Sequence, residues 1–107
     1  MCLTPAARAA VARIVFIGQD KACKCARTRI DVTWAALQSA LEGHPQITVE
    51  SLTMDQDEDE FDRYDEMQSL VVAPGIYFLD AEGRLISLLQ GEQTKPQILE
   101  VLEPKER

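Results

Sequence analysis

The chain has 107 residues, a formal net charge of -7 and a hydrophobic fraction of 46%. This length is typical of one domain, so residues 1–107 are expected to fold as a single unit around one core. No stretch is apolar for long enough to span a membrane, and the acidic balance excludes a surface that binds nucleic-acid phosphates.

The first predicted elements are a helix, a strand and a second helix. Thr4 followed by Pro5 is typical of a helix start and predicts a helix over residues 4–12. Residues 13–18 are rich in β-branched and aromatic side chains without polar alternation, which indicates a central strand buried on both faces. Apolar residues at spacings of three and four predict an amphipathic helix over residues 30–41.

Two of the three cysteines, Cys23 and Cys25, lie between this strand and this helix. The thiolate is the reactive form of cysteine, and a helix N-terminus lowers a thiol pKa. Four cations surround the two thiols in an otherwise acidic chain: Lys21, Lys24, Arg27 and Arg29. This contrast is the strongest functional signal in the sequence, and it predicts that one of the thiols has a pKa below its ordinary value.

The second half of the chain predicts a strand, an acidic helix, a hairpin and a last helix. Residues 47–52 are the strand, and residues 54–67 carry eight of the eighteen acids. We interpret the acidic segment as a helix with one solvated and one apolar face, the latter continued by Leu70 and Val71. Residues 76–79 and 85–89 are predicted hairpin strands, and Thr94 is expected to cap a helix over residues 94–102.

The alternation of helices and strands predicts an α/β fold with a parallel pair and a late antiparallel hairpin. From about residue 9 to residue 102 the chain resembles the thioredoxin-like proteins. Three features carry the resemblance: the cysteine pair after the first central strand, the Ala73-Pro74 step before a hairpin, and Gly91 before the last helix. The resemblance implies a thioredoxin-like fold with a central mixed four-stranded sheet flanked by helices on both faces. It also implies a cis bond at Pro74, facing the cysteines.

The cysteine spacing departs from the family, whose redox motif has two residues between its cysteines. Here only Lys24 separates Cys23 from Cys25. In an ungapped register the family's first cysteine falls on Ala22 and its second on Cys25. With one inserted loop residue, Cys23 takes the nucleophile position and Cys25 the resolving position. Both registers are compatible with the sequence. A second departure is Gly75 after the proline, where the family more often has threonine.

Three function classes remain open. The resemblance favours a thiol–disulfide oxidoreductase that uses Cys23 and Cys25, with Pro74 shaping a groove for a protein disulfide or a small thiol and with no cofactor. Alternatively, the same thiolates would bind a soft metal or metalloid, with a third ligand from Cys2 or from a second subunit. The third class is an interaction module without turnover, because a fold does not determine a function.

The cysteine content also bears on the compartment. Three cysteines are too few and too unevenly placed for a disulfide-stapled secreted scaffold, and residues 1–12 lack the apolar core of a signal peptide. We therefore expect a reducing, cytoplasmic location.

Overall fold

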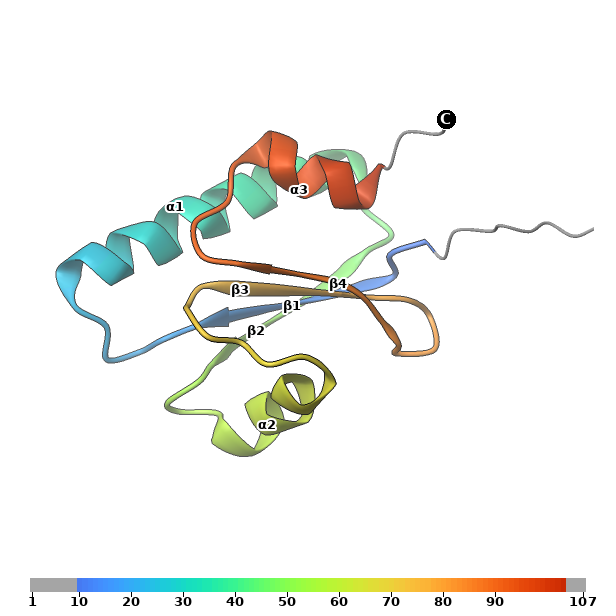
Figure 1. The fold of residues 1–107 in the computed structure, drawn as a ribbon. Helices are drawn as coiled ribbons and strands as arrows, with labels where there is room; N and C mark the ends of the chain where they lie inside the picture. Colours follow the sequence, from blue (N-terminus) through green and yellow to red (C-terminus); the bar gives the residue numbers. More distant parts are fainter. Residues whose placement is uncertain (1–9, 104–107) are drawn as a thin grey trace, which may run out of the picture.

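A computed structural model describes residues 10–103 of the chain. Strands and helices follow one another along the chain, with two consecutive strands before the last helix (Figure 1). Their order is β1 (Arg13–Gly18), α1 (Lys24–Ala40), a short 3-10 helix (Leu41–Gly43), β2 (Thr48–Thr53), α2 (Glu58–Met67), β3 (Gly75–Leu79), β4 (Leu85–Gln90) and α3 (Lys95–Leu102).

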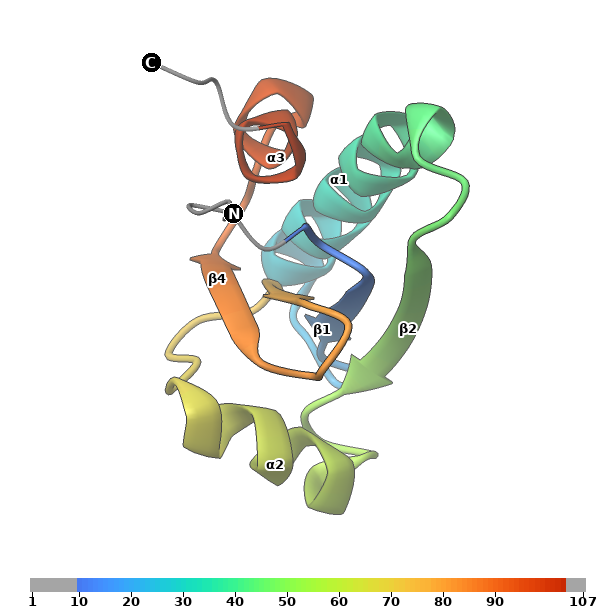
Figure 2. The same ribbon diagram turned by 90° about the vertical axis from the view of Figure 1, so that its right-hand side faces the viewer.

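The four strands form one mixed sheet in the order β2-β1-β3-β4. The β1–β2 pair is parallel and is connected through α1, whereas β3 runs antiparallel to both β1 and β4. Helices α1 and α3 lie together on one face of this sheet, and α2 covers the other face (Figure 2). The structure therefore confirms the predicted four-stranded sheet with helices on both faces.

The two central strands are buried on both faces because their side chains alternate between two core clusters. In β1, Ile14 and Phe16 pack with the buried residues of α1 and α3, while Val15 and Ile17 pack on the side of α2. Phe16 meets the Trp34 ring edge-to-face with centroids 4.9 Å apart. This alternation explains why the sequence of β1 has no polar face.

The predicted helix over residues 4–12 is wrong at its C-terminal end, since Ala10, Val11 and Ala12 are not helical. The backbone of Ala12 is used by the sheet: its N–H donates to Leu79 O at 2.8 Å, and its carbonyl accepts from Thr48 N at 3.3 Å. These bonds compete with helical ones for the same groups. The earlier part of that prediction, residues 4–9, lies outside the described residues.

The acidic helix α2 ends at Met67, so the apolar face predicted to continue through Leu70 and Val71 is only partly correct. Leu70 is buried in a non-helical segment, where its N–H donates to the Asp65 carboxylate at 2.9 Å. Val71 is 82% exposed. Residues beyond the helix no longer follow its periodicity, so Val71 leaves the core face.

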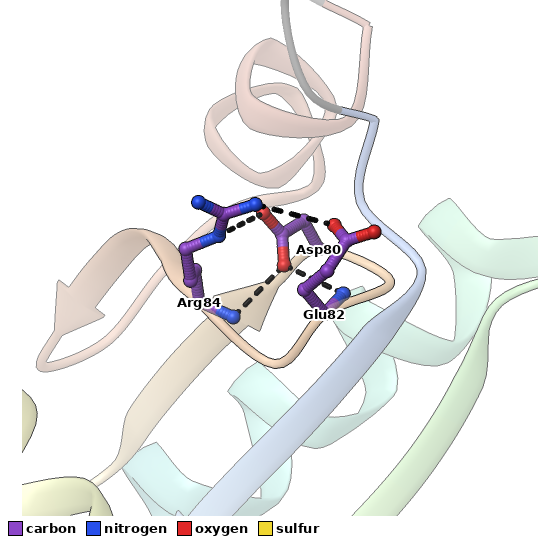
Figure 3. A network of polar contacts seen from close by, with 3 residues as sticks. All are labelled: Asp80, Glu82 and Arg84. Atoms are coloured by element: carbon purple, nitrogen blue, oxygen red, sulfur yellow. Dashed lines mark hydrogen bonds and ion pairs between the residues drawn. The ribbon is translucent and has the colours of Figure 1, made fainter.

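The β3–β4 turn is organised by one carboxylate (Figure 3). Asp80 accepts hydrogen bonds from the backbone N–H groups of Glu82 and Arg84, at 2.9 and 2.8 Å, and its other oxygen lies 3.6 Å from the Arg84 guanidinium. Gly83 has a φ of 83°, a left-handed value that favours glycine. The hairpin predicted from the late glycine is thus present.

The last helix begins where the sequence predicts. Thr94 is the N-cap of α3: its hydroxyl accepts from Gln97 N, and the Gln97 side chain accepts from Thr94 N at 2.8 Å. This reciprocal arrangement satisfies two backbone donors at the helix start. In the described part of the chain, no helix has the length and apolar character needed to cross a membrane.

Candidate functional site

Two thiols lie where the chain passes from β1 into α1. Cys23 is the N-cap residue of α1, with an extended backbone (φ -67°, ψ 168°), and Cys25 is the second residue of the helix. Both thiols are free and exposed. The Arg27 N–H donates to Cys23 O at 2.8 Å, so regular helical bonding begins directly at Cys23. The sequence prediction of a thiol pair at a helix start is therefore correct in its location.

The pKa of the Cys23 thiol is lowered from its ordinary value, mainly by the backbone N–H of Ala26. The N–H of Cys25 and the positive charge of Arg29 act in the same direction, whereas desolvation opposes them. The neutral side chain makes no capping hydrogen bond. The unpaired backbone N–H groups of the first helical turn therefore lower the pKa by stabilising the thiolate form of Cys23.

The side chain of Asp55 holds the loop before Cys23. From the sequence alone, Asp55 belongs to the acidic segment predicted to have a solvated helix face. The Asp55 carboxylate accepts one hydrogen bond from Asp20 N at 2.8 Å and another from Lys21 N at 2.7 Å. These two N–H groups lower the pKa of Asp55. The Arg27 guanidinium donates to Asp20 O from the other side.

The position of Asp55 after the second predicted strand indicates that it lies near the thiol loop, although it does not identify the N–H groups that Asp55 binds. The residue lies two positions after the end of β2, and the carboxyl ends of the parallel strands β1 and β2 lie at one edge of the sheet, with Gly18 paired to Thr53. A polar side chain just after the second strand of a β-α-β unit therefore lies close to the loop that follows the first strand.

Pro74 lies at the same end of the sheet as the cysteine loop. The Ala73–Pro74 bond is cis. Gly75 is paired with Ile17, next to the last residue of β1, and Pro74 O accepts from Gly91 N at 2.8 Å. The β1–α1 connection and the segments before β3 and after β4 leave the sheet together, at the left in Figure 1. The ring of Pro74 itself is fully buried, and the exposed apolar side chains nearby in sequence are Val71 and Val72.

The structure explains the glycine that follows this proline. A Cβ atom on Gly75 would lie 2.5 Å from Leu70 Cδ1 and 2.8 Å from Leu70 Cδ2. Leu70 thus occupies the space that a larger residue at position 75 would need. The departure from the family's threonine is a packing consequence of the segment that leads into β3.

The charged surroundings of the thiols are also as the sequence indicates. Four exposed cations lie between positions 21 and 29: Lys21, Lys24, Arg27 and Arg29. Among residues 10–103, ion pairs involve Arg13, His44 and Arg84, and none of the four cations lies within 4.0 Å of a carboxylate oxygen. Lys21 acts electrostatically on the Asp55 carboxylate, and Lys24, Arg27 and Arg29 have no ion-pair partner among the described residues.

A metal site would need ligands beyond those near the two thiols. Across residues 10–103, no three or more His, Cys, Asp or Glu side chains form a cluster that could hold a metal ion. Cys2, the third ligand considered from the sequence, lies outside the described residues. The metal-binding alternative thus depends on that residue or on a second subunit.

No protein-family model matches the chain, and no curated protein does either. Solved structures do match. Thioredoxin-2 of a malaria parasite has a TM-score of 0.68 at 8% identity, over 92% of this chain and 86% of that one. A thioredoxin-like protein from Clostridium perfringens has a TM-score of 0.63 at 18% identity, over 90% and 71%. Mitochondrial thioredoxin 3 from Saccharomyces cerevisiae has a TM-score of 0.61 at 14% identity, over 82% and 72%. The chain therefore has a thioredoxin-like fold, and at such identities the likeness extends to the fold alone.

Proposed function

We propose that the chain is a thiol–disulfide oxidoreductase in which Cys23 attacks the substrate and Cys25 resolves the mixed disulfide. The observation that supports this most is the position of Cys23, an exposed thiol at the N-cap of α1 whose pKa is lowered. The redox character of the structural neighbours agrees with it.

In the first step the Cys23 thiolate attacks one sulfur of a substrate disulfide. A mixed disulfide forms, and the other substrate sulfur leaves as a thiolate. Cys25 then loses its proton and attacks Cys23 Sγ, which releases the second substrate thiol and leaves a Cys23–Cys25 disulfide. The substrate gains two electrons and the cysteine pair loses two, so a reducing thiol must restore the pair. A reducing compartment such as the cytoplasm would supply one.

The resolving step requires movement of the first helical turn. Residues two positions apart on a helix do not face each other, and Cys25 belongs to α1 while Cys23 only caps it. Release of the N-terminal turn breaks few hydrogen bonds because its first N–H groups have no helical partner. We expect the turn to open when the disulfide closes.

Pro74 is assigned an architectural role in this proposal. Its ring is buried, so it contributes the cis turn and leaves substrate contacts to the exposed backbone and side chains before it. Val71 and Val72 are 82% and 47% exposed. They offer apolar contact for a protein disulfide at the sheet end that carries the thiols.

Trapping of the mixed disulfide tests the assignment. The Cys25→Ser chain should accumulate a covalent adduct through Cys23 when it is mixed with a disulfide-bonded protein, because attack remains and resolution is lost. The Cys23→Ser chain is the matched control and should trap nothing. The opposite pattern would make Cys25 the nucleophile, as in the ungapped register. No adduct from either variant, with zinc or copper co-purifying with the unmodified chain, would replace the proposal with metal binding.

A further inference from the structure

The cations around Cys23 are not explained by the stability of α1. A helix N-terminus carries partial positive charge, so acids stabilise its first turn and cations destabilise it. Helix α2 follows this rule with Glu58, Asp59 and Glu60 in its first turn. Helix α1 does the opposite, with no acid in its first turn and Lys24 as its first residue.

Lys21 acts electrostatically on the Asp55 carboxylate, whereas Lys24, Arg27 and Arg29 have no ion-pair partner among the described residues that would account for them. Among the described residues none of the four makes an ion pair, and the Arg27 guanidinium donates to a neutral carbonyl, Asp20 O. Two carboxylates face this region, and both are used otherwise. Asp55 binds the backbone N–H groups of the loop, and Asp20 accepts from the Gln56 amide at 3.2 Å.

No acid stands between Asp20 and Asp31, so the sequence around the thiols is uniformly cationic within an acidic molecule. Arg29 is close enough to Cys23 to act on its charge, and Lys24 and Arg27 follow Cys23 in the first turn and a half of the helix start. An approaching group within this region meets several positive charges at once. Exposed charges of one sign raise the local concentration of ligands of the opposite sign and speed their association.

We propose that Cys23 selects disulfides that carry carboxylates next to their sulfur atoms, in preference to neutral or cationic disulfides. The inference rests on the proposed function and names the substrate class for the same site. Carboxylates two to four atoms from the scissile S–S bond would lie beside Lys24, Arg27 and Arg29 when the Cys23 thiolate attacks. The covalent chemistry is the exchange already described: one S–S bond breaks, one forms, and a carboxylate-bearing thiolate leaves.

A ratio of rates separates this selection from general activation of the thiol. Arg29 also favours the thiolate of Cys23, and that effect multiplies its rate with every disulfide by the same factor. When the rate with an anionic disulfide is divided by the rate with a cationic disulfide, the factor due to thiol activation cancels. Division by the same quotient for a free, uncharged model thiol removes the intrinsic reactivity of the two probes.

The test uses the Cys25→Ser chain with three small probes: dithiodipropionate, bis(2-hydroxyethyl) disulfide and cystamine. Formation of the Cys23 adduct is followed by mass spectrometry at low salt and at about 0.5 M salt. We expect the normalised quotient to favour the anionic probe by about tenfold at low salt and to approach one at high salt. Lys24→Glu should reduce the low-salt preference severalfold. Arg63→Glu is the matched control on α2, away from the thiols, and should leave the preference unchanged.

Two results overturn the inference: a quotient equal to that of the model thiol, or a preference that Lys24→Glu does not reduce. A failure of the proposed function is distinct, because Cys23 would then react with all three probes no faster than the model thiol. A last arm compares dithiodipropionate with a peptide disulfide flanked by glutamates. The faster of the two identifies a small molecule or an acidic protein segment as the source of the carboxylates.

Discussion

The contact between Gly75 and Leu70 allows a quantitative prediction at the residue that follows Pro74. Gly75→Ala would place a Cβ atom 2.5, 2.8 and 3.2 Å from the Cδ1, Cδ2 and Cγ atoms of Leu70. Carbon atoms pack at about 3.5–4.0 Å, so all three distances are too short. Because both methyl groups of Leu70 are affected, rotation of one of them does not relieve the overlap.

The expected loss of folding free energy follows from the two ways in which the structure can relieve this overlap. Either Leu70 leaves its buried position or β3 shifts against β1, to which Gly75 is paired through Ile17. Overpacking of this kind costs about 1–3 kcal/mol, and we expect about 2 kcal/mol here. For a chain of this size, that corresponds to a decrease in melting temperature of roughly 10 °C.

A double-mutant cycle tests whether the contact with Leu70 causes the loss of stability in Gly75→Ala. Leu70→Ala alone should destabilise the protein by about 2–3 kcal/mol because it leaves a cavity. In that background Gly75→Ala should cost almost nothing, which gives a coupling energy of about 2 kcal/mol. Gly43→Ala is the matched control, since a Cβ at Gly43 would meet nothing within 4 Å and its φ is not left-handed.

Urea unfolding followed by circular dichroism measures all four chains and the control. An equal free-energy cost of Gly75→Ala with and without the Leu70 side chain would show that this contact does not cause the loss of stability. A cost of Gly75→Ala no greater than that of Gly43→Ala would refute the predicted overlap.

Three further predictions concern the thiol, its loop and the sheet. Alkylation of Cys23, followed by peptide mass spectrometry, should have a midpoint below the ordinary thiol pKa of about 8.5, and Arg29→Gln should raise that midpoint; a midpoint at or above 8.5 contradicts the assignment. Asp55→Asn should speed amide exchange at Asp20 and lower stability at pH 7, whereas Asp59→Asn, in the first turn of α2, should leave exchange at Asp20 unchanged. Because the pKa of Asp55 is lowered in the folded state, its stabilisation exists above the usual carboxyl pKa of about 4 and is lost as pH falls through the folded value; an Asn effect that does not begin to shrink as pH falls below about 4 argues against this. Tyr77→Phe removes a hydrogen bond to Gln68 O and should cost about 1 kcal/mol. Burial raises the pKa of Tyr77 to about 12, so stability should fall as pH rises from about 10 toward 12, and unfolding of the Phe variant should lack this part of the decrease.

Much of the fold was accessible from the sequence because its signals are local. The unbroken apolar run of β1, the capping pair of Thr94 and Gln97, and the late Gly83 of the hairpin each identify an element from neighbouring residues alone. The position of Cys23 at a helix start followed in the same way, since a strand-like run and a helix-like run bracket it.

The errors occurred where a distant part of the chain decides the outcome. The residues around Ala12 predict a helix, yet its backbone N–H bonds to β3 and its carbonyl bonds to β2. The residues around Asp55 predict a solvent-exposed acid, yet its carboxylate binds the backbone N–H groups of a loop 34 and 35 residues away.

The sequence by itself determined the four strands, the helices between and after them, their order and the cationic setting of the two thiols. Only the tertiary structure decided which groups hold the thiol loop, why position 75 favours glycine, and that Pro74 is buried. The physical reason is the range of the interactions. Helix and strand periodicity is expressed over a few consecutive residues, whereas the partners of Asp55 and Gly75 are set by how strands align in space, which no local pattern encodes.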